Sequence, residues 1–236
     1  MRAIETVLFD FGGTLDADGV AWKERFHALY RDEGLGLSAE AFAPAFYAAD
    51  DALVGALAPT TGLEETVETL VAGLEAELAR CAGRERTDDT RGRRVASRFL
   101  SEMTAAFDRN RPILKALGER YRLGVVSNFY GNLEAACESS GLAPLFGAVT
   151  DSERVGAEKP EPAIFQAALS ALDATAETAV MVGDSLRRDG EGARRSGMRF
   201  IWIAPEPVQA AERGGAADRP VLAAVTELPG LLGLLT

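Results

Sequence analysis

The spacing of apolar residues in the first half of the chain is typical of amphipathic helices. Val95, Phe99, Met103 and Phe107 recur at four-residue steps, which places them on one side of a helix. Glycine and proline residues separate four such segments. The pattern predicts helices over residues 21–33, 38–53, 63–82 and 88–108. Because no strand pattern interrupts them, we expect residues 18–108 to form a helical bundle of their own.

Short apolar runs alternate with helical segments in the rest of the chain. The pattern predicts strands over residues 7–9, 123–126, 148–150, 179–182, 199–203 and 221–225. It predicts helices over residues 112–121, 132–140, 162–172, 187–196 and 228–235. This alternation is typical of a doubly wound parallel α/β sheet, which we expect residues 1–17 and 109–236 to form. The loop over residues 205–220 is expected to be mobile.

The composition is that of a globular protein without a nucleic-acid or membrane partner. The chain has 236 residues, of which 47% are hydrophobic and 26% are charged. Its net charge of −11 disfavours binding to nucleic-acid phosphates and to anionic membrane surfaces. The sequence shows no pattern of a secretion signal or a membrane span, so we expect a cytoplasmic protein. A monomer and a homodimer are both compatible with the sequence.

Lysine is rare in this chain. Only Lys23, Lys115 and Lys159 are lysines among its 25 basic residues, and all the others are arginines. A lysine ammonium group is a compact point charge, whereas an arginine guanidinium group is a planar fork. Each retained lysine is therefore a candidate for a site that needs an ammonium group.

Polar residues follow three of the predicted strands at the point where each strand ends. Asp10 follows the first strand, and Ser127 and Asn128 follow the second. Asp184 ends a later strand, and Asp189 comes five residues after it. The carboxyl ends of parallel strands meet at one edge of the sheet, so these side chains are expected to converge. Each of them also has a structural explanation, as a turn residue or a helix cap.

A fourth polar segment, residues 158–162, is a loop that opens a helix and contains Lys159. The four segments are Asp10-Phe11-Gly12-Gly13-Thr14, Val126-Ser127-Asn128, Lys159-Pro160 and Gly183-Asp184-Ser185 with Asp189. In their order and spacing, the chain resembles the haloacid dehalogenase (HAD) superfamily of hydrolases. The resemblance covers essentially the whole chain. It implies a Rossmann-like core with an inserted α-helical cap of the C1 type, which identifies subfamily I.

The resemblance also implies a Mg²⁺ site at the strand ends. Mg²⁺ prefers oxygen ligands and few carboxylates. The resemblance assigns as ligands the carboxylates of Asp10 and Asp184 and the carbonyl oxygen of Gly12. Asp189 belongs to the same metal site, where its place favours orienting a metal-bound water or Lys159.

The activity that the resemblance implies is that of a phosphatase acting on a small phosphorylated metabolite. Asp10 is the expected nucleophile, which forms an aspartyl-phosphate. The Ser127 hydroxyl, the Asn128 N–H and the Lys159 ammonium are expected to neutralise the phosphoryl group. Thr14 is expected to position Asp10 and the attacking water.

The chain departs from the phosphatases of this superfamily at Gly12, where they usually carry a second aspartate that protonates the leaving group. Such a general acid–base group is worth about 10² to 10⁴ in rate. The substrate can be one whose leaving group needs little protonation, such as an acyl phosphate or a sugar 1-phosphate. The proton can also come from Asp16, from Asp18, from a cap residue or from the substrate. As a third alternative, hydrolysis is weak or absent.

Two other functions therefore stay open. The 2-haloacid dehalogenases of the superfamily also lack the second aspartate, but they need no metal, whereas this chain retains Asp184 and Asp189. A catalytically weak binding or regulatory protein on the same scaffold is the other alternative.

Two groups of residues in the helical segment are given structural roles. We expect Trp22, Phe46 and Tyr47 in the core of the bundle rather than in the wall of a substrate site. A solvated helix face is expected for four arginines, with contact to a substrate anion as the alternative. These are Arg91, Arg93, Arg94 and Arg98.

Overall fold

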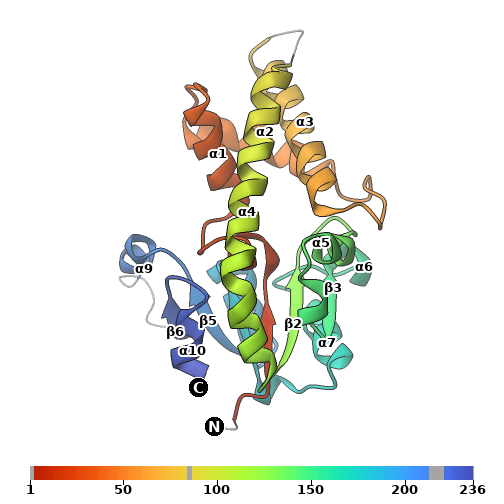
Figure 1. Ribbon diagram of the computed structural model, residues 1–236, viewed down its shortest axis with the longest axis vertical. Coiled ribbons are helices and arrows are strands. Elements are labelled where there is room, and N and C mark those ends of the chain that lie inside the picture. Colours follow the sequence, from red (N-terminus) through yellow and green to blue (C-terminus); the bar gives the residue numbers. More distant parts are fainter. Residues whose placement is uncertain (1–2, 84–86, 213–220, 236) are drawn as a thin grey trace.

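A computed structural model of the chain describes residues 3–83, 87–212 and 221–235. An α/β core carries a helical unit at one end, and the long helix α4 (Asp89–Gly118) runs through both (Figure 1). The helical unit is inserted between the first and second strands, as the sequence predicts. No helix of the described residues has both the length and the apolar composition needed to cross a bilayer.

The core is built on a six-stranded sheet in which every strand pair is parallel. The strands are β1 (Thr6–Phe9), β2 (Arg122–Ser127), β3 (Ala148–Asp151), β4 (Ala179–Gly183), β5 (Arg199–Ile203) and β6 (Val221–Val225). Their spatial order, β3-β2-β1-β4-β5-β6, is a doubly wound Rossmann-like order and confirms the predicted fold class. Since β1 lies between β2 and β4, the carboxyl ends of these three strands are neighbours at the point where the strand order reverses. Open α/β sheets bind their ligands at such a point.

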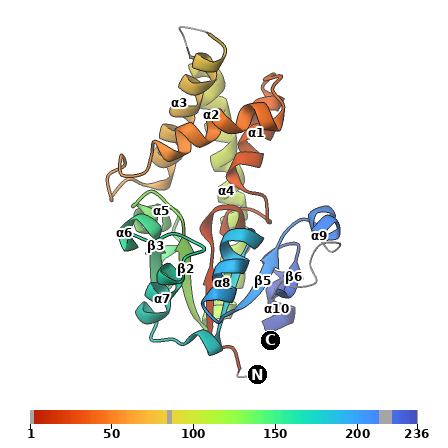
Figure 2. The same ribbon diagram turned by 180° about the vertical axis from the view of Figure 1, so that it is seen from behind.

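Helices cover both faces of the sheet, with α4 in front in Figure 1 and α8 in front in Figure 2. The side chains of β1 alternate between two apolar clusters, with Val7 and Phe9 in one and Leu8 in the other. The first cluster includes residues of α4, α5 (Leu133–Ser139) and α10 (Gly230–Leu235). The second includes residues of α7 (Pro162–Ala171) and α8 (Glu191–Arg195). Burial on both faces explains why the central strands are almost continuously apolar.

Two short helices lie outside these layers. Helix α6 (Ser152–Val155) follows β3, and α9 (Glu206–Glu212) follows β5. The predicted mobile loop over residues 205–220 therefore includes a helix in its first half. Its second half, residues 213–220, lies outside the described residues.

Helix α4 continues from the helical unit into the core. The predicted helix break at residues 109–111 is wrong, because α4 passes through it with Pro112 in its interior. A proline inside a helix removes one backbone hydrogen bond. Beyond it, however, Leu114 and Leu117 are buried in the same apolar cluster as the sheet. Burial of this stripe outweighs the lost hydrogen bond, and the expected domain boundary between residues 108 and 109 falls inside one helix.

The helical unit is closed around aromatic side chains. It consists of α1 (Trp22–Asp32), α2 (Ala39–Asp51), α3 (Leu63–Cys81) and the first half of α4. The ring of Phe26 stacks on that of Phe99 with centroids 4.1 Å apart, and the Arg25 guanidinium lies over the Phe99 ring at the same distance. Phe99 thereby joins α4 to α1.

Three arginines of α4 pair with carboxylates of α3 and of the end of α1. Arg91 contacts Glu75 of α3 at 2.6 Å, and both side chains are largely buried. The predicted solvated face is therefore wrong for Arg91, because helix packing covers it. Three more partly exposed interactions follow: Arg94 with Glu33 at 2.7 Å, Arg98 with Asp32 at 2.9 Å, and Arg93 with Thr90 at 3.5 Å.

We expect Phe99→Ala to lower the free energy of unfolding by about 3–5 kcal/mol, because it leaves a cavity between α1 and α4. Urea denaturation of the purified protein measures this change. The matched control is Val54→Ala at a half-exposed site, which is expected to change stability by less than about 0.5 kcal/mol. A similar small effect for Phe99→Ala would contradict the packing described here.

Candidate active site

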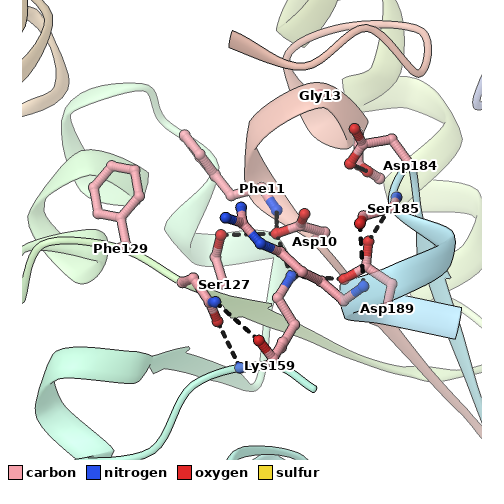
Figure 3. A network of polar contacts seen from close by, with 12 residues as sticks. Asp10, Phe11, Gly13, Ser127, Phe129, Lys159, Asp184, Ser185 and Asp189 are labelled. Atoms are coloured by element: carbon pink, nitrogen blue, oxygen red, sulfur yellow. Dashed lines mark hydrogen bonds and ion pairs between the residues drawn. The ribbon is translucent and has the colours of Figure 1, made fainter. Parts of the chain in front are cut away.

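Asp10 lies just beyond the end of β1, where hydrogen bonds hold its carboxylate in place (Figure 3). The side chain is only slightly exposed, and one of its oxygens, Oδ1, accepts two hydrogen bonds. One comes from the backbone N–H of Phe11 at 2.7 Å and the other from the hydroxyl of Ser127 at 2.7 Å. Since Ser127 is the last residue of β2, this contact joins two neighbouring strand ends.

The ammonium group of Lys159 lies between two carboxylates. Its Nζ atom is 2.7 Å from Asp10 Oδ1 and 2.7 Å from Asp189 Oδ1, and the side chain is buried. Burial lowers the pKa of Lys159, but the charges of Asp10 and Asp189 outweigh it and keep the pKa above its ordinary value. Lys159 is therefore a protonated cation beside Asp10.

Asn128 positions the loop that carries Lys159. Its side-chain oxygen accepts a hydrogen bond from the backbone N–H of Lys159 at 2.7 Å. Its amide nitrogen donates to the carbonyl oxygen of the same residue at 3.2 Å. The Asn128 side chain is thus occupied by the backbone of Lys159, a positioning role that sequence reasoning did not foresee.

Three carboxylates come together at the ends of β1 and β4. Asp10, Asp184 and Asp189 each place an oxygen within 4.8 Å of the others, an arrangement that could hold a metal ion. Burial, together with the charges of Asp10 and Asp189, raises the pKa of Asp184 well above its ordinary value. Burial also raises the pKa of Asp189 to about 6, against the opposing charge of Lys159. A cation would relieve this crowding of negative groups, so the donor set fits an oxygen-preferring divalent ion.

Two other predicted residues lie beside this cluster. The Thr14 hydroxyl donates to Asp184 at 3.5 Å, so its contact is with the metal-site carboxylate rather than with Asp10. Asp189 also accepts a hydrogen bond from the backbone N–H of Ser185 at 3.0 Å. Gly13 has a φ of +84°, and a Cβ atom there would lie 2.7 Å from Asp184 Oδ2, so only glycine fits at this position.

Asp16 stabilises the turn that follows Asp10. Its carboxylate is buried and accepts hydrogen bonds from the backbone N–H of Gly13 at 2.6 Å, from Trp22 Nε1 at 2.7 Å and from Arg25 at 2.7 Å. Burial raises the pKa of Asp16, and Arg25 opposes that rise. All its oxygens are engaged away from the cavity, so the prediction of Asp16 as a proton carrier is not supported. Asp18 is paired with Arg109 at 2.7 Å and does not line the cavity either.

The space next to Gly12 is taken by the indole of Trp22. A Cβ atom at Gly12 would lie 3.1 Å from Trp22 Nε1 and 3.4 Å from Cδ1. The indole is held there by its hydrogen bond to Asp16. Where the related phosphatases are expected to carry an acid, this chain therefore has a glycine covered by an aromatic ring.

A cavity of about 500 Å³ opens between the strand ends and the helical unit. Asp10, Gly12, Ser127, Asn128, Lys159 and Asp184 all line it. So do Trp22, Phe46 and Tyr47, and the expectation that they belong only to the bundle core is wrong. Trp22 and Phe46 are both buried in the bundle and exposed to the cavity on one side, because the aromatic cluster reaches the end of the bundle that meets the core.

Four charged or polar residues of the cavity wall received no role from the sequence. They are Lys23, Asp50, Tyr130 and Arg188. The scarcity of lysine does indicate the cavity. Lys23 and Lys159 both line it, whereas Lys115 is exposed on α4. No sequence pattern indicated Asp50. It lines the cavity from the helical unit, and its carboxylate accepts a hydrogen bond from the Tyr130 hydroxyl of the core.

A sequence model of the haloacid dehalogenase-like hydrolase family matches residues 4–197. This chain is a haloacid dehalogenase-like hydrolase. The assignment drawn from the four polar segments is thereby confirmed.

Several curated haloacid dehalogenase-like proteins share part of this sequence. Haloacid dehalogenase-like hydrolase domain-containing protein 3 of Bos taurus is 37% identical over 108 residues, which are 45% of this chain and 43% of the relative. A phosphoserine phosphatase of Thermus thermophilus is 44% identical over 64 residues, 27% of this chain and 26% of the relative. A glyceraldehyde 3-phosphate phosphatase of Pyrococcus abyssi is 38% identical over 93 residues, 38% and 37% of the two chains. This chain thus spans less than half of the length of each of them.

Solved structures of this family share the whole fold. A putative HAD-hydrolase of Bacillus subtilis, YfnB, whose crystal structure is bound to magnesium, aligns over 99% of both chains with a TM-score of 0.59 and 21% identity. The L-2-haloacid dehalogenase RSc1362 aligns over 99% of both chains with a TM-score of 0.63 and 23% identity. At these identities the likeness shows only the fold. A dehalogenase and a putative hydrolase both have this fold, so it does not distinguish their activities.

We expect Asp16→Ala to lower the free energy of unfolding by about 3–5 kcal/mol, because it removes the buried partner of the Arg25 guanidinium and leaves only the half-exposed Glu102 at 3.6 Å. The control Asp18→Ala removes a partly exposed ion pair and is expected to cost less than about 1 kcal/mol. Chemical denaturation distinguishes the two variants. Equal effects would show that the Asp16 network does not stabilise the turn.

Proposed function

We propose that this hydrolase is a Mg²⁺-dependent phosphatase that acts on a small phosphorylated metabolite through an aspartyl-phosphate at Asp10. In this proposal residues 1–17 and 109–236 form the catalytic core, and residues 18–108 form the cap. The observation that carries it is the contact of one carboxylate oxygen of Asp10 with both Ser127 and Lys159, beside a crowded carboxylate pair. The phosphatase names of several partial relatives support the same substrate class.

The metal would be held by Asp10, Asp184 and the carbonyl oxygen of Gly12, with Asp189 completing the cluster. Bound there, Mg²⁺ would offset the negative charge of the phosphoryl oxygens and of the carboxylates. Lys159 contacts Asp10 and Asp189 but leaves Asp184 without an ion pair among the described residues, which is the reason to expect a second cation.

Each of four residues has its own role in the proposed reaction. The carboxylate of Asp10 attacks the phosphorus atom, and the bond from phosphorus to the leaving oxygen breaks. The Ser127 hydroxyl and the Lys159 ammonium stabilise charge on the transferred group. Water next attacks the phosphorus of the aspartyl-phosphate, which releases phosphate and restores Asp10. Asn128 contributes by keeping Lys159 in place.

We expect Asp10→Asn to abolish Mg²⁺-dependent phosphate release from acetyl phosphate, p-nitrophenyl phosphate and a panel of phosphorylated metabolites, because an amide is a poor nucleophile and a poor Mg²⁺ ligand. The control Asp108→Asn lies at an exposed site outside the cavity and is expected to retain activity. Removal of the metal with a chelator should reproduce the loss. Activity in Asp10→Asn equal to that of the wild type would overturn the proposal.

The glycine at position 12 determines which leaving groups this enzyme tolerates. Without an acid at that position, we expect it to favour acyl and aryl phosphates, whose leaving groups need little protonation, over alkyl phosphates. Gly12 is also compatible with a binding or regulatory protein that turns over every substrate slowly.

A restored acid provides a direct test. Gly12→Asp alone is not expected to raise the rate, because its side chain would meet the Trp22 indole. Combined with Trp22→Ala, it is expected to raise the rate for alkyl phosphates relative to aryl phosphates by about 10² or more. Trp22→Ala alone is the control, and the ratio in the double variant is compared with the ratio in this single variant. If the two ratios are equal, the missing acid does not limit the reaction.

A 2-haloacid dehalogenase is the second candidate, because Gly12 and the shared fold are compatible with it. The carboxylate cluster favours the phosphatase, since a dehalogenase of this superfamily needs no metal. Halide release from 2-chloropropionate in the presence of a chelator, without phosphate release from any ester, would reverse this order.

A further inference from the structure

Arg188 places a guanidinium group without a partner in the wall of the cavity. It lies on the helical turn that follows Asp184, and its side chain is exposed to the cavity. Within the part of the chain that the structure describes, the guanidinium forms no hydrogen bond and no ion pair, and its charge only opposes the rise that burial causes in the pKa of Asp50. Two arginines near the cavity but outside its lining are paired, Arg25 with Asp16 and Arg109 with Asp18.

The backbone of Arg188 is held in a defined position relative to Asp10. Its N–H donates to the hydroxyl of Ser185 at 3.1 Å. The next residue, Asp189, binds the ammonium group of Lys159, which in turn contacts Asp10. These contacts fix the distance between the Asp10 carboxylate and the backbone of Arg188. A ligand that contacts both residues must match that distance.

The cavity is larger than a phosphate group requires. Its volume of about 500 Å³ falls in the range of sites for whole small molecules, about 300–1,000 Å³. Lys23 adds a second cation to the wall, 3.1 Å from Glu24 and 5.5 Å from the centre of the Tyr47 ring. Beyond the strand ends, the cavity thus contains one ammonium group with a partner and one guanidinium group without one.

We propose that Arg188 binds a second anionic group of the substrate while the phosphoryl group is at Asp10. A guanidinium group presents parallel N–H donors that match the two oxygens of a carboxylate or of a phosphate. The substrate is accordingly a phosphorylated carboxylic acid or a bisphosphate. This inference rests on the proposed phosphatase function and names the substrate class of the same site.

The competing role for Arg188 is an ion pair with Asp50 that holds the cap against the core. The two roles differ in what the substrate must carry. A substrate ligand discriminates between molecules with and without the second anion, whereas a cap contact affects both alike.

The test compares two probes that differ only in the second anion, 3-phosphoglycerate and glycerol 3-phosphate. We expect the wild type to have the higher kcat/KM for 3-phosphoglycerate. In Arg188→Gln the ratio of the two kcat/KM values should fall by about 10- to 100-fold, mainly through KM, because a charge-assisted hydrogen-bond pair is lost. The matched control is Arg187→Gln, whose side chain is exposed and outside the cavity, and it should keep the ratio. Glycerol 1,3-bisphosphate distinguishes a phosphate from a carboxylate as the preferred second anion.

A ratio that does not change in Arg188→Gln, or no preference for the anionic probe in the wild type, would overturn the inference and leave the phosphatase proposal intact. If no phosphate ester is hydrolysed, the phosphatase proposal fails, and calorimetric titration with the same two probes still decides the role of Arg188. Tighter binding of 3-phosphoglycerate that Arg188→Gln removes would support the inference. Equal binding of the two probes would overturn it.

Discussion

The candidate site depends on one buried cation, the ammonium group of Lys159. It lies within 2.7 Å of Asp10 and of Asp189, and so joins β1, the turn after β4 and the loop before α7. Removing a charge from water is costly, and only close opposite charges and hydrogen bonds compensate for it. Only one lysine accompanies the three clustered carboxylates, so the negative charge at Asp184 is not compensated by a contacting cation among the described residues. The geometry of the site and the fit of its carboxylates to a second cation therefore have the same origin.

A second constraint connects the turn after Asp10 to the helical unit. The carboxylate of Asp16 binds the backbone of the turn, the first residue of α1 and the Arg25 guanidinium together. The indole that it orients covers Gly12, so the missing side chain and the aromatic ring complement each other. Gly12 is thus part of a coordinated arrangement of the turn and α1, in which the glycine, the Trp22 indole and Asp16 fit together.

The cavity is lined by residues of both units. The core contributes the strand-end residues to the cavity, whereas Trp22, Phe46 and Tyr47 of the helical unit line it from the other unit. The core also contributes Arg188 and Tyr130 to the lining, and the Tyr130 hydroxyl donates a hydrogen bond to Asp50 of the helical unit. A residue on either side gains its role only when the two units are docked, because the cavity exists only between them.

The sequence by itself determined the fold class, the helical insertion and the residues of the strand ends. Short-range periodicity and the positions of polar residues after strands depend on local order along the chain, and Asp10, Ser127, Lys159, Asp184 and Asp189 do converge as predicted. Only the tertiary structure decided the continuity of α4 through Pro112, where burial against the sheet outweighs a local breaking signal. It alone also showed that Asp16 is a structural anchor and that Asn128 holds the Lys159 backbone. These roles depend on contacts between residues far apart in the chain or on which way a side chain turns, and neither is encoded in the spacing of residues.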